Sequence, residues 1–200
     1  MRCSIFNRYC AEFLTRVTFA RQNSAQNYLR IQDQEVDVMT TNTGHSSQAT
    51  EDPILQNVTF RLAEETYGIN VMQIQEVLRY TEIAPVPGAP NYVLGIINLR
   101  GNVVTVIDTR TRFGLPAADV TDHSRIVVLE IEGQVIGILV DAVAEVVYIK
   151  HSEMETAPNV GNEESARFIQ GVCNKNGELI ILVEFEKMLS EEEWSEVSSF

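Results

Sequence analysis

Two blocks of this sequence recur, and the recurrence limits the fold more than any other feature. Residues 67–77, YGINVMQIQEV, align with residues 136–146, IGILVDAVAEV, so that one glycine, one valine and the final Glu-Val pair coincide. Further along, residues 95–108 align with residues 171–184 and share Gly, Asn and Gly at the same places. A chain made of two related halves is expected to fold into two similar units.

The repeated blocks lie in segments that alternate apolar and polar residues, which is typical of β-strands. Residues 58–63 (VTFRLA) alternate in this way, a turn follows, and an apolar run resumes at residue 67; the same order of parts returns over residues 127–140. Each half then has a strand, a glycine-containing turn and a returning strand, around residues 99–102 and 175–177, and the second turn has the Asn-Gly pair of a type I′ hairpin. Because five or so short strands per half leave edges to hide, the sequence predicts two small β-barrels that share one core.

Composition separates an N-terminal extension from a folded domain. Residues 1–31 contain five arginines and one acidic residue, and residues 40–52 are almost without apolar side chains, so burial cannot offset the entropy of ordering that leader. We interpret residues 1–38 as an upstream extension without a folded role, since a natural chain could begin at Met39; a targeting helix is the alternative. The predicted organisation is a disordered or extraneous extension and leader (1–54), a folded domain (55–190) of two pseudo-repeated halves (about 57–112 and 125–187), a short closing helix over 184–189 with a new cap signal at 190–193, and a C-terminal tail (191–200).

Charge balance and rare residue types exclude several classes of function. Lys and Arg total 15 against 28 for Asp and Glu, a formal net charge of −13, which disfavours a groove for nucleic acid. No apolar run is long enough to cross a bilayer, so no membrane insertion is expected, and the odd number of scattered cysteines fits a reducing, cytoplasmic environment. The spacing of cysteines and histidines also predicts neither a metal nor a cofactor; these residues are Cys3, Cys10, Cys173, His45, His123 and His151.

Acidic residues at strand ends lack the partners that catalysis needs. Asp108 and Asp141 end predicted strands, but no Ser/His or Cys/His motif accompanies them, and the segment GIINLRG has no Lys-Ser/Thr of a phosphate-binding loop. We therefore interpret both carboxylates as acceptors of turn hydrogen bonds and predict no catalytic residues and no enzyme.

Several blocks, taken in order over about residues 55–190, carry a resemblance to a known family. They are YGINVMQIQEV, the proline-rich loop APVPGAP, GIINLRGNVVTVIDTRTRFG, VIGILVDAVAEV and FIQGVCNKNGELIILVEFEKML. Together they resemble the CheW family, the bacterial chemotaxis coupling proteins. The resemblance implies a mostly β fold of two SH3-like five-stranded β-barrel subdomains, without catalysis. It further implies a scaffold that joins the cytoplasmic tip of methyl-accepting chemoreceptors to the regulatory domain of the histidine kinase CheA, in receptor arrays at the inner membrane.

The turn Asn98-Leu99-Arg100-Gly101 is the most distinctive of these blocks, and the resemblance ties its arginine to partner binding. A solvated arginine that merely supports the loop is the alternative. Arg100 could pair with Glu76 across the first barrel and so orient both side chains for a receptor or kinase contact. The second half has Lys175-Asn176 where the first has Leu99-Arg100, so the two barrels are expected to hold different partners.

Four apolar residues are candidates for partner contacts, and for each of them an ordinary core position is the alternative. Ile74 and Val77 are candidates to line an apolar groove for a receptor helix at the seam between the barrels. By resemblance, Ile74 falls in the partner-binding region together with Glu76. Val143 and Val146 are the corresponding candidates in the second barrel.

Two functions of other classes stay open. A small acidic enzyme would use Asp108, Asp141 or Glu145 in the cleft between the barrels, and it would show a strongly shifted carboxylate pKa beside a closed pocket. A self-assembling structural barrel protein would instead form stable homo-oligomers with no affinity for a receptor or a kinase.

Overall fold

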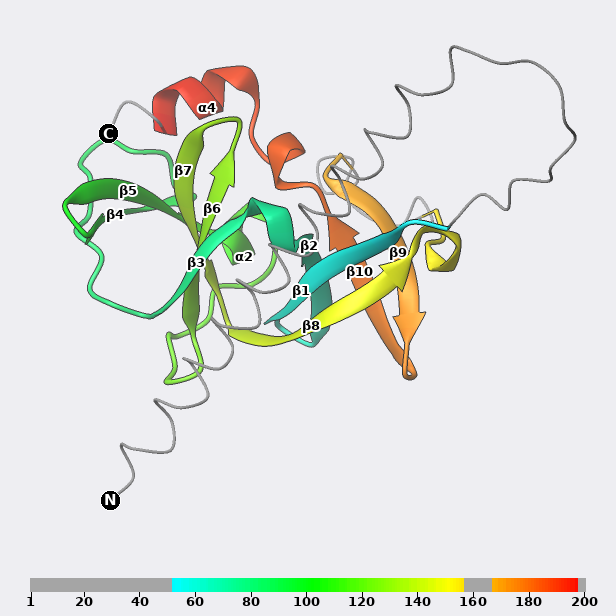
Figure 1. Ribbon diagram of the computed structural model, residues 1–200. Helices are drawn as coiled ribbons and strands as arrows, with labels where there is room; N and C mark the ends of the chain where they lie inside the picture. Colours follow the sequence, from blue (N-terminus) through cyan, green and yellow to red (C-terminus); the bar gives the residue numbers. More distant parts are fainter. Residues whose placement is uncertain (1–51, 157–166, 198–200) are drawn as a thin grey trace, which may run out of the picture.

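The computed structural model describes residues 52–156 and 167–197, and the predicted extension 1–38 lies outside these residues. Ten strands make up most of this part of the chain (Figure 1). The first half contributes β1 (Ile54–Leu62), β2 (Glu65–Asn70), β3 (Ile74–Arg79), β4 (Val93–Leu99) and β5 (Asn102–Asp108). The second half contributes β6 (Arg125–Ile131), β7 (Gln134–Val140), β8 (Ala142–Lys150), β9 (Ile169–Lys175) and β10 (Glu178–Val183).

The strands form two five-stranded sheets with the same internal order. One sheet, called here the β1 sheet, has the order β8-β1-β2-β10-β9, and the other, the β6 sheet, has the order β3-β6-β7-β5-β4. Replacing each strand of the β1 sheet by its repeat equivalent gives the β6 sheet, including the parallel pairing of β10 with β2 and of β5 with β7. The predicted repeat is therefore a structural one, and the mostly β, two-subdomain fold is confirmed.

The composition of the sheets corrects one expectation. Residues 57–112 and 125–187 were expected to close into one barrel each, yet each sheet combines strands of both halves. The last three strands of each half lie in the sheet that holds the first two strands of the other half, so β3 pairs with β6 and β8 pairs with β1. The physical reason is that β2–β3 and β7–β8 are joined by short connections that lead to the other sheet, so neither half can bury its apolar faces alone.

The hydrophobic core has one central and two lateral parts. The central cluster takes buried residues from both sheets and includes a set of packed aromatic rings, among which Phe113 and Phe168 stack at 4.4 Å between centroids. A smaller cluster lies within each sheet, around Val106 in the β6 sheet and around Leu182 in the β1 sheet. Because most of the core is shared, the two subdomains fold as one unit.

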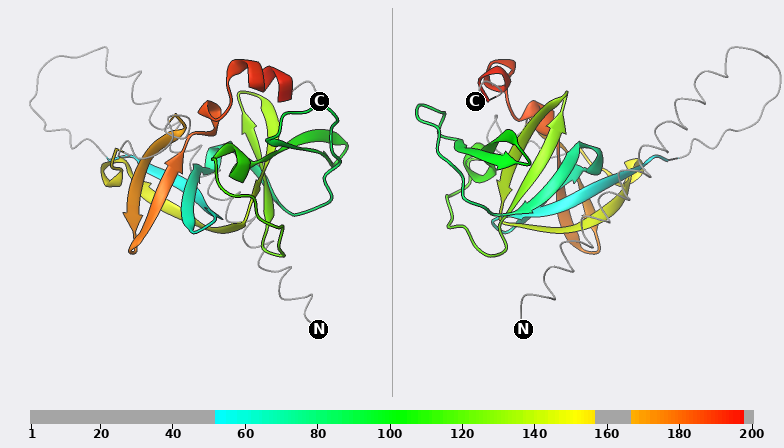
Figure 2. Two further views of the ribbon diagram at one scale, coloured as in Figure 1. Left: turned by 180° about the vertical axis from the view of Figure 1, so that it is seen from behind. Right: turned by 60° about the vertical axis from the view of Figure 1, so that its left-hand side comes forward.

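Short helical segments follow the strands (Figure 2). The chain ends in α4 (Glu191–Val197), whose cap was predicted: the Ser190 hydroxyl accepts from the Glu193 amide and the Glu193 carboxylate accepts from the Ser190 amide, a capping box. The predicted helix over 184–189 is a single turn, η4. The other segments are η2 (Val71–Gln73), α2 (Thr109–Arg112), η3 (His151–Glu153) and η4 (Phe185–Lys187). In the described part of the chain no helix has the length and apolarity to traverse a membrane.

Candidate partner-binding site

The hairpin between β4 and β5 presents its turn through backbone geometry that the sequence dictates. Arg100 and Gly101 have φ values of 53° and 93°, the two positive angles of a type I′ turn, and the Asn98 side chain accepts a hydrogen bond from the Gly101 amide at 2.9 Å. The second hairpin has the same design, with Asn176 and Gly177 at positive φ. Arginine is uncommon in this conformation, so the turn holds the Arg100 side chain outward at some cost in backbone strain.

The proline-rich loop is bound to β4 by backbone hydrogen bonds. Ala84 and Ile96 exchange two backbone hydrogen bonds of 2.9 Å, and this bridge passes directly beside Gly95. A Cβ atom at Gly95 would lie 2.1 Å from the Ala84 carbonyl oxygen, so only glycine allows the loop to approach. The strand that leads into the Arg100 turn is therefore anchored close to the turn.

The predicted pair of Arg100 and Glu76 is present. Arg100 Nη2 donates to Glu76 Oε1 at 2.7 Å, with the arginine side chain 78% exposed and the glutamate 16% exposed. One carboxylate oxygen and the rest of the guanidinium stay free of this contact. An exposed pair of this kind adds only about 0–1 kcal/mol to stability, so its main effect is to orient the two side chains.

A β-bulge in β3 explains how Glu76 reaches the surface. The pairing of β3 with β6 shifts register between Ile74 and Glu76, so that Gln75 and Glu76 both point outward while Ile74 and Val77 both point inward. Ile74 and Val77 lie in the central core, 0% and 4% exposed. Their side chains are thus core residues and do not line an open groove.

The repeat-equivalent bulge in β8 leaves its apolar residues less covered. Val143 and Val146 are half-buried and pack against the central cluster from the edge of the β1 sheet. The Thr59 hydroxyl bridges this bulge, since it donates to the Glu145 carbonyl at 3.0 Å and accepts from the Glu145 amide at 3.1 Å. β8 therefore presents a partly apolar edge, on the other sheet from the Arg100 turn.

A shallow groove beside the Arg100 turn contains residues that the sequence interpretation did not single out. Its volume is about 390 Å³, and the half-buried Leu99 contributes to its wall together with Gln75 and Val103. Val103 is 57% exposed, and its repeat equivalent Leu179 is 56% exposed. Alternation in NVVTVID does not indicate this exposure, because it places Val103 on the same face of β5 as Thr105 and Ile107, which are both buried.

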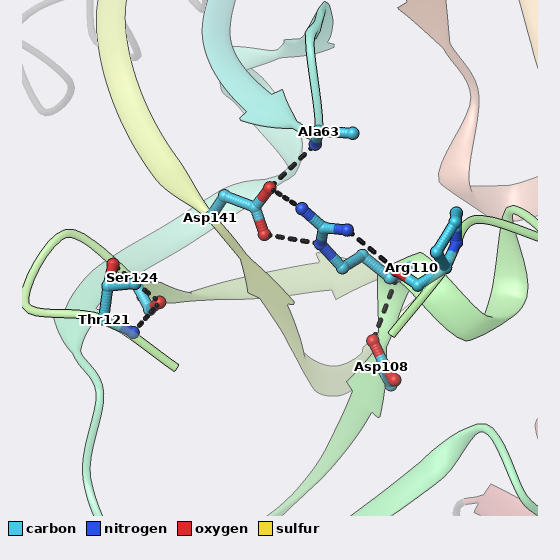
Figure 3. A network of polar contacts seen from close by, with 7 residues as sticks. Ala63, Asp108, Arg110, Thr121, Ser124 and Asp141 are labelled. Atoms are coloured by element: carbon cyan, nitrogen blue, oxygen red, sulfur yellow. Dashed lines mark hydrogen bonds and ion pairs between the residues drawn. The ribbon is translucent and has the colours of Figure 1, made fainter. Parts of the chain in front are cut away.

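Asp108 and Asp141 act as acceptors, as predicted. Asp108 caps α2 by accepting from the Arg110 amide at 3.0 Å, and its other oxygen accepts from Thr111. Asp141 accepts from Arg110 through both oxygens, at 2.8 and 2.5 Å, and from the Ala63 amide at 2.7 Å (Figure 3). Burial would raise the pKa of Asp141, but the hydrogen bonds from Arg110 and Ala63 and the charge of Arg110 lower it below its ordinary value.

These contacts leave little for catalysis by Asp108 and Asp141, two of the three carboxylates that the enzyme hypothesis named. Both oxygens of Asp141 and both oxygens of Asp108 are engaged in hydrogen bonds that hold turns and helix ends. Within residues 52–156 and 167–197, no group of three or more His, Cys, Asp or Glu side chains could hold a metal ion.

Comparison with known proteins places this geometry in a family. The model of the CheW-like domain matches residues 56–193. A chemotaxis protein CheW from Rhizobium meliloti is 34% identical over 136 residues, which is 68% of this chain and 88% of that protein. Protein FrzA from Myxococcus xanthus is 27% identical over 132 residues, 65% of this chain and 82% of FrzA. The crystal structure of the scaffolding protein TtCheW from Thermoanaerobacter tengcongensis superposes with a TM-score of 0.62 at 36% identity, covering 66% of this chain and 90% of that one.

Proposed function

Because the chain belongs to the CheW family, a family of non-catalytic chemotaxis scaffold proteins, we propose that it couples chemoreceptors to the histidine kinase CheA. In this role it binds the cytoplasmic tip of a methyl-accepting receptor and the regulatory domain of the kinase. It works in the cytoplasm, in receptor arrays at the inner membrane. Its contribution is to hold two proteins in a defined relation, and each contact needs only moderate area.

The Arg100–Glu76 pair is the observation that carries this proposal. An arginine at positive φ, 78% exposed and held by a partner that is mostly buried, is costly to maintain for stability alone. The pair presents a cation with fixed direction at the tip of a rigid hairpin. Such an arrangement serves specificity and association rate more than affinity. Asn98 and Leu99 complete this first face, Asn98 by shaping the turn and Leu99 by adding apolar surface beside it.

A second face follows from the differences between the repeats. Asn176 stands in the second hairpin where Arg100 stands in the first, so the second hairpin has no equivalent cation at its tip. β8, in turn, presents Val143 and Val146 half-exposed, where the equivalent Ile74 and Val77 are buried. One face thus presents a directed cation and the other a partly apolar edge, and we assign one partner to each.

The test is a binding experiment with the full chain, a receptor cytoplasmic tip and a CheA regulatory domain. Arg100→Ala should bind at least one partner roughly tenfold more weakly, because the directed cation is lost. The variant places another residue with a Cβ at the same φ, so the melting temperature should stay within about 2 °C. Lys187→Ala is the matched control, since it breaks another exposed ion pair, with Glu184, outside both faces.

The possible results separate the functions considered for this chain. Failure of the wild type to bind either partner would overturn the coupling function. Stable homo-oligomers without affinity for either partner would favour the self-assembling barrel. Equal loss of binding in Arg100→Ala and Lys187→Ala would leave the coupling function in place and remove Arg100 from it.

A further inference from the structure

The two subdomains are joined by two very short crossings of the chain. η2, three residues long, leads from β2 in the β1 sheet to β3 in the β6 sheet, and Asp141 alone separates β7 in the β6 sheet from β8 in the β1 sheet. The central core between the sheets is apolar, and apolar contacts have little directional preference. Polar contacts at the crossings are therefore the groups best placed to select one angle between the sheets.

Asp141 is held from both sides of its crossing. Its backbone amide donates to the Arg61 carbonyl at 3.1 Å and its carboxylate accepts from the Ala63 amide, so it is tied to the β1–β2 turn. The same carboxylate accepts the two parallel hydrogen bonds from Arg110, which belongs to α2 after β5 of the β6 sheet. Figure 3 shows the carboxylate between the Ala63 amide and the Arg110 guanidinium.

Arg110 is itself fixed within its own subdomain. Its backbone amide donates to the Asp108 side chain, and its Nη1 donates to the Pro116 carbonyl at 2.8 Å. The Arg110 side chain is 16% exposed and the Asp141 side chain 32% exposed. The Arg110 guanidinium is therefore much better shielded from water than that of Arg100, whose side chain is 78% exposed. Bidentate contacts between guanidinium and carboxylate restrict both distance and angle.

The other crossing has a much weaker counterpart. In the repeat, Met72 is the equivalent of Asp141, and Glu186 is the equivalent of Arg110. Met72 has no carboxylate, and the polar contact at this crossing is instead an exposed hydrogen bond of 2.9 Å from Gln73 Nε2 to Glu186 Oε1. A single exposed hydrogen bond between a neutral and a charged group imposes little geometry. The chain thus has one firm and one loose crossing between its sheets.

We propose that Arg110, Asp141 and the Ala63 amide form an intersubdomain clamp that sets the angle between the β1 sheet and the β6 sheet. Arg110 is then a positioning residue. Val143 lies two positions after Asp141 on β8, while the Arg100 turn lies in the β6 sheet, so the clamp sets the relation between the two proposed faces. This consequence for partner binding rests on the proposed coupling function, whereas the clamp itself does not.

The clamp can be tested without any partner, by residual dipolar couplings of backbone amides in a weakly aligned sample of the full chain. In the wild type one alignment tensor should fit the strands of both sheets. Arg110→Met keeps an unbranched apolar stem and removes the contacts, and its two sheets should require two different tensors while each sheet keeps its internal fit. Lys175→Met is the control, because it breaks an ion pair with Glu153 that lies entirely within the β1 subdomain, and one tensor should still suffice.

A single tensor for folded Arg110→Met would overturn the clamp. If Arg110→Met does not fold, Asp141→Asn replaces it, since the asparagine oxygen can still accept from the Ala63 amide but cannot pair with the charge of Arg110.

With partners added, we expect the affinity of the variant for either partner alone to change less than about twofold. The affinity for the second partner in the presence of the first should fall about fivefold. Two tensors with unaltered binding would support the clamp and contradict only its effect on coupling.

Discussion

Asn57 and Ile126 occupy equivalent places in the two repeats, yet only the isoleucine fits its surroundings. Asn57 pairs with Asn70 in the β1 sheet as Ile126 pairs with Leu139 in the β6 sheet. The isoleucine packs over Gly137, and its Cγ2 lies 3.0 Å from where a Cβ of that glycine would stand. Asn57 faces Gly68 in the same way, but its Nδ2 is buried and makes no hydrogen bond within the described part of the chain.

We predict that Asn57→Ile stabilises the protein. The change removes a buried donor without a partner and fills the place as the other repeat does, which should raise the free energy of unfolding by about 1–2 kcal/mol. Urea denaturation monitored by fluorescence of Trp194 measures the difference. Thr59→Val is the contrasting variant, because Thr59 satisfies both backbone groups of Glu145, and its loss should lower the free energy of unfolding by about 1–3 kcal/mol. A stability for Asn57→Ile below that of the wild type would mean that the amide has a role that the repeat does not reveal.

At the scale of single elements, the bulged strands β3 and β8 mark the limit of what alternation can predict. A strict period of two would put Ile74 and Glu76 on one face of β3, but the bulge reverses the direction after Gln75. The sequence therefore predicted the Arg100–Glu76 pair, which requires only that Arg100 lies in a turn and Glu76 in a strand. It left open whether the side chains of Ile74 and Val77 are accessible. Nothing in QIQEV by itself indicates a bulge, since its cause is pairing with β6.

The bridge between the proline-rich loop and β4 gives a test at the same scale. Gly95→Ala should lower the free energy of unfolding by at least about 2 kcal/mol, because its Cβ meets the Ala84 carbonyl at 2.1 Å and its φ of 142° is strained for any residue but glycine. Gly171→Ala, the repeat equivalent, should cost less, since the corresponding distance to the Glu155 carbonyl is 2.8 Å. Thermal and urea denaturation of the two variants measure which one loses more free energy of unfolding.

Gly88→Ala separates strain from steric conflict in that comparison. Its φ is 83°, and no atom lies within 4 Å of the added Cβ, so only the conformational cost of about 1 kcal/mol applies. If Gly95→Ala costs no more than Gly88→Ala, the loop moves aside easily and does not anchor the Arg100 hairpin.

Across the whole molecule, the repeat predicted the number and the equivalence of the strands but could not assign them to sheets. Aligning the two halves shows that Gly68 and Gly137 are equivalent positions. The alignment does not show which strands pair with each other, so it is compatible with either assignment of strands to sheets. The exchange of β3–β5 with β8–β10 between the sheets follows from the crossings at η2 and Asp141, and the shortness of these crossings is known only once the strand ends are known. The exposure of Val103 could not be predicted for a related reason. An apolar residue in a strand is expected to be buried, and the exposure of Val103 follows from the position of β5 between β4 and β7.

The link between the sheets also predicts how the molecule responds to acid. The pKa of Asp141 is lowered from its ordinary value of 3.8, so the native state binds a proton there less readily than the unfolded state does. The stabilisation from this carboxylate is therefore complete above pH 3.8 and is lost as the pH falls through the lowered native pKa. Asp141→Asn should be less stable than the wild type at pH 7 and should lose less stability than the wild type on acidification below pH 3.8. Urea denaturation at pH 7, 5 and 3 measures both quantities, with Glu153→Gln as a control whose lowered pKa arises within the β1 subdomain. Parallel losses in the wild type and Asp141→Asn would show that protonation of other groups, and not release of the bond between the subdomains, dominates acid unfolding.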